Sequence, residues 1–188
     1  MKQRNVGYAL LACCALFGFV IANGAYAADT ALCKGCHGVP DNETAPNIAG
    51  MSAKYIASSL NKYRERLRPC DLGMCDMAAS LSDEDIEDLA RQFAAEKFVP
   101  ADQKTDPALV AKGKKIHDKN CEKCHLGGGA KVDDAFGILA GQKMTYLRNQ
   151  IDYVLAGTRK VHRKMLPRVE ALSKDDIEAV IQYYGSQK

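Results

Sequence analysis

The chain has 188 residues, of which 47% are hydrophobic, 26% are charged and 7% are aromatic, and it contains no Trp. This composition is that of a globular protein, and the length allows one ordinary domain or two small ones with lean cores, which a large bound cofactor would complete. The net charge of +3 would fall to about +1 without the first 27 residues, so charge does not indicate a nucleic acid as partner.

The first 27 residues are predicted to be an export signal. Lys2 and Arg4 precede an apolar run from residue 6 to residue 22, and Ala25-Tyr26-Ala27 is a small-x-small cleavage site. We therefore expect cleavage after Ala27 and a periplasmic protein. The alternative is an uncleaved membrane anchor, because the run approaches the roughly 18 apolar residues that make a spanning helix plausible.

Two C-x-x-C-H motifs account for four of the six cysteines that lie beyond this segment. Two thiols three positions apart on a helical turn can each add to one vinyl group of a single porphyrin, and the adjacent His then lies beneath the iron. We therefore predict two covalent haems of the c type. The predicted attachment cysteines and the His ligands of the iron are Cys33, Cys36, His37, Cys121, Cys124 and His125.

Other uses of a C-x-x-C pair fit this sequence poorly. A thioredoxin-like redox pair would follow a strand of a βαβ unit, and no β-branched strand pattern precedes either motif. A structural zinc site would need a second pair nearby, whereas the two pairs here are 88 residues apart. Haem attachment is therefore the favoured interpretation.

The chain also repeats itself. The offset of 88 residues between the motifs becomes 91 further along, where Tyr55 matches Tyr146, so three residues are inserted near the glycines at 127–129. A period of this size indicates duplicated domains. We expect a first domain over residues 28–99 and a second over residues 100–188, separated by a polar linker.

Each half is predicted to be helical. Ser82 and Ser173 are predicted N-caps, since acidic residues follow them in the first turn and apolar residues then recur at helical spacing. Further helices are expected over residues 53–66, 107–120 and 144–155. The predicted fold class is all-α.

An iron with His on one face needs a ligand or an open site on the other. Met74 and Met165 occupy the same position of the repeat, shortly before the last helix of each half, and we predict both to be axial ligands. Met77 is the alternative in the first half. Ligation by a second His, with His117 and His162 as the available side chains, is a further alternative.

The order of C-x-x-C-H, an Ala-Gly and Tyr segment, Met and a final Leu-Ser helix resembles the class I c-type cytochromes, and the duplication resembles their dihaem members. Within this group, residues 113–125, 138–142 and 164–165 resemble the cytochrome subunit of flavocytochrome c sulfide dehydrogenase. The resemblance implies two tandem class I domains, each wrapped around one covalent haem, in an electron-transfer protein that is not itself an enzyme.

The same resemblance implies partners and a place of action. The donor would be a sulfide-oxidising flavoprotein, whose two-electron flavin the two haems would empty in single-electron steps in the periplasm. The alternative is a free dihaem shuttle of the c-four group that delivers electrons to a terminal oxidase. Contact with a membrane is expected only if the N-terminal segment is uncleaved.

Two features depart from the family pattern. Only five residues separate Ala27 from Cys33, so the first domain lacks the usual N-terminal helix, or the signal is cut earlier or retained. Cys70 and Cys75 bracket Met74, and in an oxidising compartment we expect them to form a disulfide that stiffens the ligand loop. A redox-active pair that handles a sulfur substrate, or Cys75 as a thiolate ligand of the iron, is the alternative.

Basic side chains cluster before both predicted Met ligands. They would dock an acidic partner or neutralise haem propionates, or they form a solvated helix face, and the sequence does not decide between these functions. The residues are Lys62, Arg64, Arg66, Arg68, Arg159, Lys160, Arg163 and Lys164.

Overall fold

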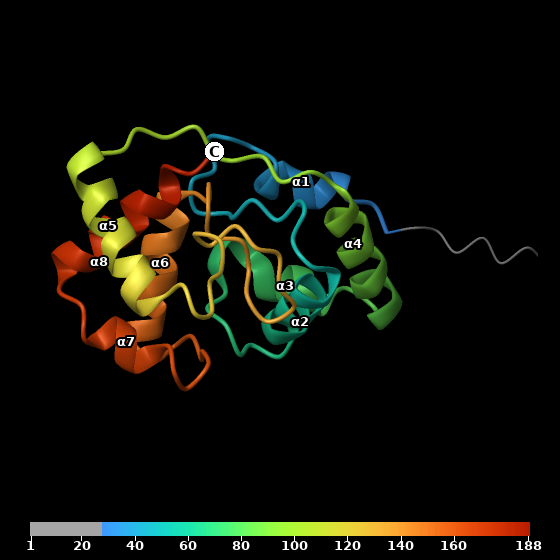
Figure 1. Ribbon diagram of the computed structural model, residues 1–188. Coiled ribbons are helices and arrows are strands. Elements are labelled where there is room, and N and C mark those ends of the chain that lie inside the picture. Colours follow the sequence, from blue (N-terminus) through green and yellow to red (C-terminus); the bar gives the residue numbers. More distant parts are fainter. Residues whose placement is uncertain (1–27) are drawn as a thin grey trace, which may run out of the picture.

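The computed structural model describes residues 28–188, and the predicted export signal lies outside the described residues. Residues 28–188 form helices and no strand, so the all-α prediction is confirmed (Figure 1). In this range no helix is both long and apolar enough to cross a membrane.

The first half, residues 28–99, begins directly with the helix that carries the first motif. Its elements are α1 (Ala31–His37), α2 (Ala53–Arg64), the 3₁₀ helix η1 (Asp71–Gly73), α3 (Met74–Ala79) and α4 (Asp83–Ala95). The second half, residues 100–188, contains α5 (Pro107–Asn120), α6 (Met144–Leu155), α7 (Leu166–Glu170) and α8 (Lys174–Gly185). In Figure 1 the helices of the second half lie together on the left and those of the first half on the right.

The last helix of each half begins with the same cap. The Ser82 hydroxyl accepts a hydrogen bond from the backbone N–H of Asp85, and the Asp85 carboxylate accepts one from the backbone N–H of Ser82. Ser173 and Asp176 form the same reciprocal pair. Each reciprocal pair is a capping box, which satisfies backbone N–H groups that the first turn of a helix leaves unpaired. The two predicted N-caps are therefore confirmed.

Each half has its own apolar core. In the first half α2 and α4 bring together Met51, Ile56, Ala57, Ile86, Ala90 and Phe93, and Ile138 from the second half joins them. In the second half the core lies between α6 and α8 and consists of Leu147, Val180, Ile181, Tyr183 and Tyr184.

The two halves differ at the start of the domain. In the second half α5 packs closely on α8, since a Cβ at Gly113 would lie 1.9 Å from the carbonyl oxygen of Ala179. The first half has no helix before α1 within residues 28–188. There, the position on α4 that matches Ala179 is Asp88, whose carboxylate accepts a hydrogen bond from the backbone N–H of Ala28.

Polar contacts between the halves fix their relative position. The fully buried Gln142 exchanges two hydrogen bonds of 2.9 Å with the backbone of Asn47. The ammonium group of Lys143, which is also buried, donates to the carbonyl oxygens of Val39 and Asn42 at 2.8 Å. These buried bonds satisfy groups that would otherwise be costly to remove from water, so the halves are held as one unit.

Candidate haem-binding sites

The helix α1 presents the first motif. Cys33 and Cys36 are free thiols, both half-buried, and they lie one helical turn apart. Burial raises the pKa of the Cys33 thiol. The pair has the spacing that two thioether bonds to one porphyrin require.

His37 is oriented by a hydrogen bond to a backbone carbonyl. Its Nδ1 lies 2.9 Å from the carbonyl oxygen of Pro46, which can only accept, so Nδ1 carries the proton and Nε2 keeps its lone pair. Burial lowers the pKa of the imidazole and favours the neutral form. The ring is therefore in the state that binds a metal through Nε2.

The second motif lies at the end of α5. Cys121 ends the helix, and the backbone N–H of His125 donates to the Cys121 carbonyl oxygen at 2.9 Å, which closes the turn that holds Cys124. Burial raises the pKa of the Cys121 thiol and lowers the pKa of His125. The His125 ring packs against Phe136 with 5.1 Å between the ring centroids.

His117 has a different role from the one that iron ligation would require. It is fully buried, its Nδ1 lies 2.9 Å from the Tyr184 hydroxyl, and its Nε2 is hydrogen-bonded to the Glu122 carboxylate. Both ring nitrogens are occupied, so His117 supports the core of the second half. The signal in the sequence is its spacing from Val110 and Gly113, which follows one helix face.

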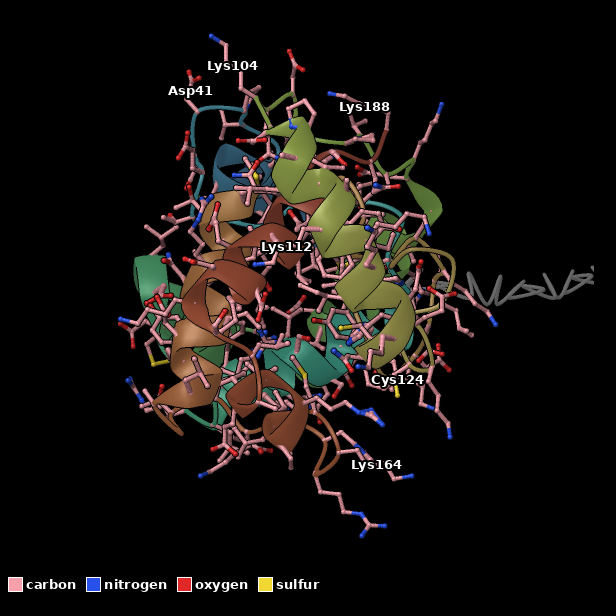
Figure 2. All side chains as sticks on the ribbon, turned by 60° about the vertical axis from the view of Figure 1, so that its left-hand side comes forward. Asp41, Lys104, Lys112, Cys124, Lys164 and Lys188 are labelled. Atoms are coloured by element: carbon pink, nitrogen blue, oxygen red, sulfur yellow. A yellow bond between two sulfur atoms is a disulfide. The ribbon has the colours of Figure 1, made fainter. Side chains whose placement is uncertain are left out.

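The two predicted Met ligands occupy matching places. Met74 is the first residue of α3, Met165 immediately precedes α7, and both are half-buried. In the second half the Arg168 guanidinium donates to the Asn120 carbonyl oxygen at 3.4 Å, so α7 lies beside the end of α5. In Figure 2 Cys124 and Lys164 both lie in the lower part of the view. The assignment of both Met residues as iron ligands stays a prediction.

Cys70 and Cys75 form a disulfide with 5.1 Å between their Cα atoms. Cys75 is buried and Cys70 is exposed. A cysteine in a disulfide has no thiolate to offer, so the alternative in which Cys75 binds the iron does not apply to this state.

The predicted basic clusters separate into two kinds. Arg68 is buried against Tyr63, with 4.8 Å between its Cζ and the ring centroid, and its Nη2 has no hydrogen-bond partner. Arg64 and Arg66 instead reach the surface, where they pair with Asp83 and Asp76. The two surface ion pairs contribute little to stability in water. The buried guanidinium of Arg68, in contrast, requires an anion as partner.

Haem c fits the residues that are present. A buried guanidinium with an unpaired nitrogen suits a propionate, because a permanently charged buried group normally has a partner. The two pairs of free thiols and the neutral imidazoles are the groups that covalent attachment and proximal ligation need. The residues that would hold the two cofactors are therefore those predicted from the motifs, together with Arg68.

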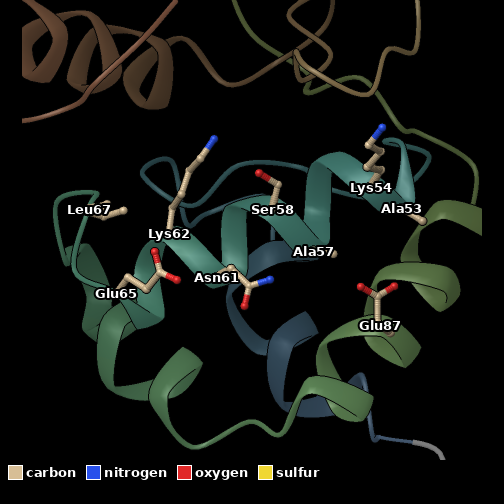
Figure 3. A pocket seen from close by; sticks show the side chains of 9 residues that line it. All are labelled: Ala53, Lys54, Ala57, Ser58, Asn61, Lys62, Glu65, Leu67 and Glu87. Carbon is tan, nitrogen blue, oxygen red and sulfur yellow. The ribbon is translucent and has the colours of Figure 1, made fainter.

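A separate surface groove of about 660 Å³ lies between α2 and α4 (Figure 3). None of the predicted cofactor-binding residues lines it. Six of the nine residues that line it are polar or charged, and they include Lys54, Asn61, Glu65 and Glu87.

Two family models match the chain, one in each half. A model described as cytochrome c matches residues 21–91, and one described as cytochrome C oxidase, cbb3-type, subunit III matches residues 108–183. The two matches therefore agree with the internal repeat.

Curated relatives match most of the chain. Cytochrome c4 of Pseudomonas aeruginosa is 32% identical over 171 residues, which cover 83% of this chain and 84% of the relative. A protein named thiosulfate dehydrogenase electron acceptor, from Stutzerimonas stutzeri, is 30% identical over 171 residues, which cover 82% of this chain and 78% of the relative.

The fold matches a solved structure over nearly the same range. The crystal structure of reduced recombinant cytochrome c4 from Pseudomonas stutzeri superposes with a TM-score of 0.72 at 29% identity, covering 85% of this chain and 95% of that chain. The prediction of two tandem class I cytochrome c domains is confirmed by this similarity.

Proposed function

Because this chain belongs to the dihaem class I cytochromes c of the cytochrome c4 type, which transfer electrons and are not enzymes, we propose that it carries single electrons in the periplasm away from an enzyme that oxidises inorganic sulfur compounds. The chain binds two covalent haem c groups. The observation that carries the proposal is the pair of C-x-x-C-H turns, each with a half-buried imidazole of lowered pKa beside two free thiols.

Within this proposal the two domains are residues 28–99 and 100–188, and each holds one haem. Haem c supplies reversible one-electron chemistry at its iron when it is bound. The proposed attachment residues are Cys33, Cys36, Cys121 and Cys124, and the proposed axial ligands are His37 and Met74 in the first domain and His125 and Met165 in the second.

The side chains around each site orient and neutralise the group. The bond from His37 to Pro46 fixes the ring so that Nε2 faces away from the backbone. The buried charge of Arg68 balances a propionate. None of these groups needs to gain or lose a proton during turnover, as suits a carrier of single electrons.

The unequal charge of the two halves supports docking of an acidic partner on the second half. Residues 28–99 hold eight Lys and Arg against twelve Asp and Glu, a net charge of −4, whereas residues 100–188 hold sixteen against eleven, a net charge of +5. Four exposed cations flank the second motif and Met165 in the sequence, and exposed cations steer an anionic protein toward the surface that carries them. They are Lys119, Lys123, Arg163 and Lys164.

The donor we propose first is a sulfide-oxidising flavoprotein, which the resemblance to the flavocytochrome c subunit implies. A reduced flavin gives up two electrons, and a partner with two haems accepts both in successive single steps. The relative named thiosulfate dehydrogenase electron acceptor supports a sulfur-oxidising donor of a second kind.

The alternative function is a free shuttle that delivers electrons to a terminal oxidase. It is favoured by the match of residues 108–183 to a family model named for an oxidase subunit. In this case the protein would stay separate from any flavoprotein and its cationic surface would dock the oxidase.

The test is the rate of haem reduction in the intact holoprotein, followed by stopped-flow absorbance. Separate samples are mixed with a sulfide-oxidising flavoprotein and sulfide, and with a thiosulfate dehydrogenase and thiosulfate. We expect fast reduction by one of these donors, which slows at least tenfold as salt rises and as Arg163→Glu/Lys164→Glu reverses two of the four exposed charges. Slow reduction by both donors, with fast oxidation by a terminal oxidase, would favour the shuttle.

A matched variant controls for net charge. Arg91→Glu/Lys97→Glu makes the same change on exposed positions of the first half, in and after α4. We expect it to leave the rate within about twofold of the parent protein, because screening in salt limits charge effects to about 10 Å. An equal slowing by both variants would contradict docking at the second half.

A further inference from the structure

The Met74 loop of the first half is closed by a covalent bond. The disulfide joins residues five positions apart, so Asp71, Leu72, Gly73 and Met74 lie inside the ring that it forms. Met74, the proposed iron ligand, is directly bonded through the backbone to the disulfide residue Cys75. Breaking the disulfide therefore directly affects the backbone that positions Met74.

The two sulfur atoms of the disulfide differ in access. Cys75 is only 2% exposed, whereas Cys70 lies at the surface. The Nη1 of Arg66 lies 3.8 Å from the Cys70 Sγ, and the same guanidinium pairs with the Asp76 carboxylate at 2.8 Å. Cys70 therefore presents the sulfur that a solvent thiolate can attack, and this sulfur lies beside the Arg66 guanidinium.

The backbone of the loop needs external restraint. Arg66 and Leu72 have φ values of 54° and 52°, in the left-handed region that non-glycine residues rarely adopt. Such conformations persist when the surrounding structure holds them. Besides the disulfide, the restraints are the Arg66–Asp76 pair and a hydrogen bond from the Tyr153 hydroxyl to Asp71, and both lie at or near the surface. The disulfide is the covalent one of the three.

We propose that the Cys70–Cys75 disulfide is a thiol-exchange site, and that its reduction by a dithiol releases Met74 from the first haem iron while the second haem keeps Met165. This inference rests on the proposed ligation by Met74. It assigns to the first half a chemical input that the second half does not share, because the residues matching Cys70 and Cys75 are Val161 and Leu166.

The exchange is balanced with a dithiol as the reductant. A thiolate of the dithiol attacks the Cys70 Sγ, a mixed disulfide forms, and Cys75 leaves as a thiolate that takes up a proton. The second thiol of the reductant then attacks the reductant's other sulfur, which is bonded to Cys70 in the mixed disulfide. Cys70 leaves as a thiolate and is protonated in turn. The reductant becomes a disulfide, and the protein gains two electrons and two protons.

The experiment uses the full holoprotein and dithiothreitol as the probe. After treatment the thiols are capped with iodoacetamide and counted by mass, the haems are reoxidised with ferricyanide, and the weak near-infrared band of Met-ligated ferric haem is recorded. We expect two caps per chain and loss of about half of the band, since one of two haems loses its Met.

Two variants assign the loss to one haem. In Met165→Ala only the first haem keeps a Met ligand, so dithiothreitol should remove the whole remaining band. In Met74→Ala half of the band should be absent from the start, and dithiothreitol should leave the rest unchanged. If Met74→Ala keeps the full band before any thiol is added, the ligand assignment fails, which is separate from a failure of the exchange.

The inference itself is overturned by either of two results. One is complete capping of both thiols with the band unchanged in the parent protein and in Met165→Ala. The other is a disulfide that dithiothreitol leaves intact in the folded protein. Cys70→Ser/Cys75→Ser should show the half-band spectrum without treatment, and the chemical reduction of the parent protein gives the answer if this variant does not fold.

Discussion

The loop that precedes Met74 in the first half and the loop that precedes Met165 in the second half are held by different restraints. In the first half the turn after α2 places Arg66 at a φ of 54°, and in the second half the residue at the same repeat position is Gly157, with a φ of 72°. The first loop is then closed by a disulfide, whereas the second carries exposed cations and no covalent closure. The comparison shows that the duplicated backbone was kept while its restraints diverged.

The divergence has a physical reason. Glycine adopts the left-handed conformation without a steric cost, so the loop of the second half needs little else to hold its turn. Arginine at the same position needs restraint, and the first loop supplies it through Asp76 and the disulfide. Each loop therefore combines a backbone choice with the restraint that this choice requires.

The largest effect should come from removing one pair of attachment cysteines. Cys121→Ala/Cys124→Ala should leave one covalent haem per chain, and Cys33→Ala/Cys36→Ala should do the same for the other half, because each pair serves one cofactor. Intact mass and the haem content of the denatured protein measure this. Two covalent haems in either variant would contradict one haem per half.

Gly113→Ala should destabilise the second half by about 1–3 kcal/mol, the usual cost of overpacking. The added Cβ would lie 1.9 Å from the Ala179 carbonyl oxygen, so α5 must move away from α8. Denaturant unfolding of the holoprotein is the measurement. Gly35→Ala is the control, since its Cβ would meet nothing within 4 Å. Equal stability of the two variants would mean that the α5–α8 contact yields easily.

Gly157→Ala should cost about 1–2 kcal/mol, the penalty of the left-handed region for a residue with a Cβ. Its Cβ would meet no atom within 4 Å, so the cost is that of the backbone alone. Arg66→Gly tests the first loop. Glycine removes the steric cost of the left-handed backbone conformation, and this gain offsets the loss of an exposed ion pair worth about 0–1 kcal/mol. We expect this variant to be at least as stable as the parent in thermal unfolding. A large loss would show that the Arg66 side chain is the main restraint.

Tyr153→Phe should lower the free energy of unfolding by a modest amount, about 0.5–1.5 kcal/mol, because it removes one hydrogen bond between the halves. The bond to Asp71, 2.7 Å long, raises the pKa of Tyr153 to about 12 from its ordinary value of 10.0. A raised folded-state pKa stabilises the protein below the unfolded pKa, and this contribution is lost between pH 10 and pH 12. The stability difference between parent and variant should therefore vanish as pH rises through this range. A difference that stays constant would contradict the assigned bond.

Much of this architecture was predictable because it depends on local pattern. The two capping boxes, the expected helices over residues 107–120 and 144–155 and the offset of the repeat need only short stretches of sequence, and the structure has those helices. The helix expected over residues 53–66 ends at Arg64, where the chain turns toward the left-handed Arg66. The C-x-x-C-H motifs can also be found from the sequence alone, because each is a local pattern of five residues.

The contacts between the halves could not be predicted in the same way. The contacts of Lys143 and Gln142 leave no trace in local pattern, since their partners are backbone groups roughly a hundred residues away. The burial of Arg68 was hidden within a run of basic residues whose other members reach solvent. Only packing of two distant segments separates a buried cation from its exposed neighbours.

The buried bonds of Gln142 and Lys143 have a kinetic consequence. Domains joined by a weak interface exchange electrons only as fast as they reorient, and this reorientation slows in a viscous solvent. Here the halves are fixed by hydrogen bonds from two buried side chains, so transfer between the two haems needs no reorientation. The internal step should therefore keep its rate in glycerol, while the encounter with a partner slows in proportion to viscosity.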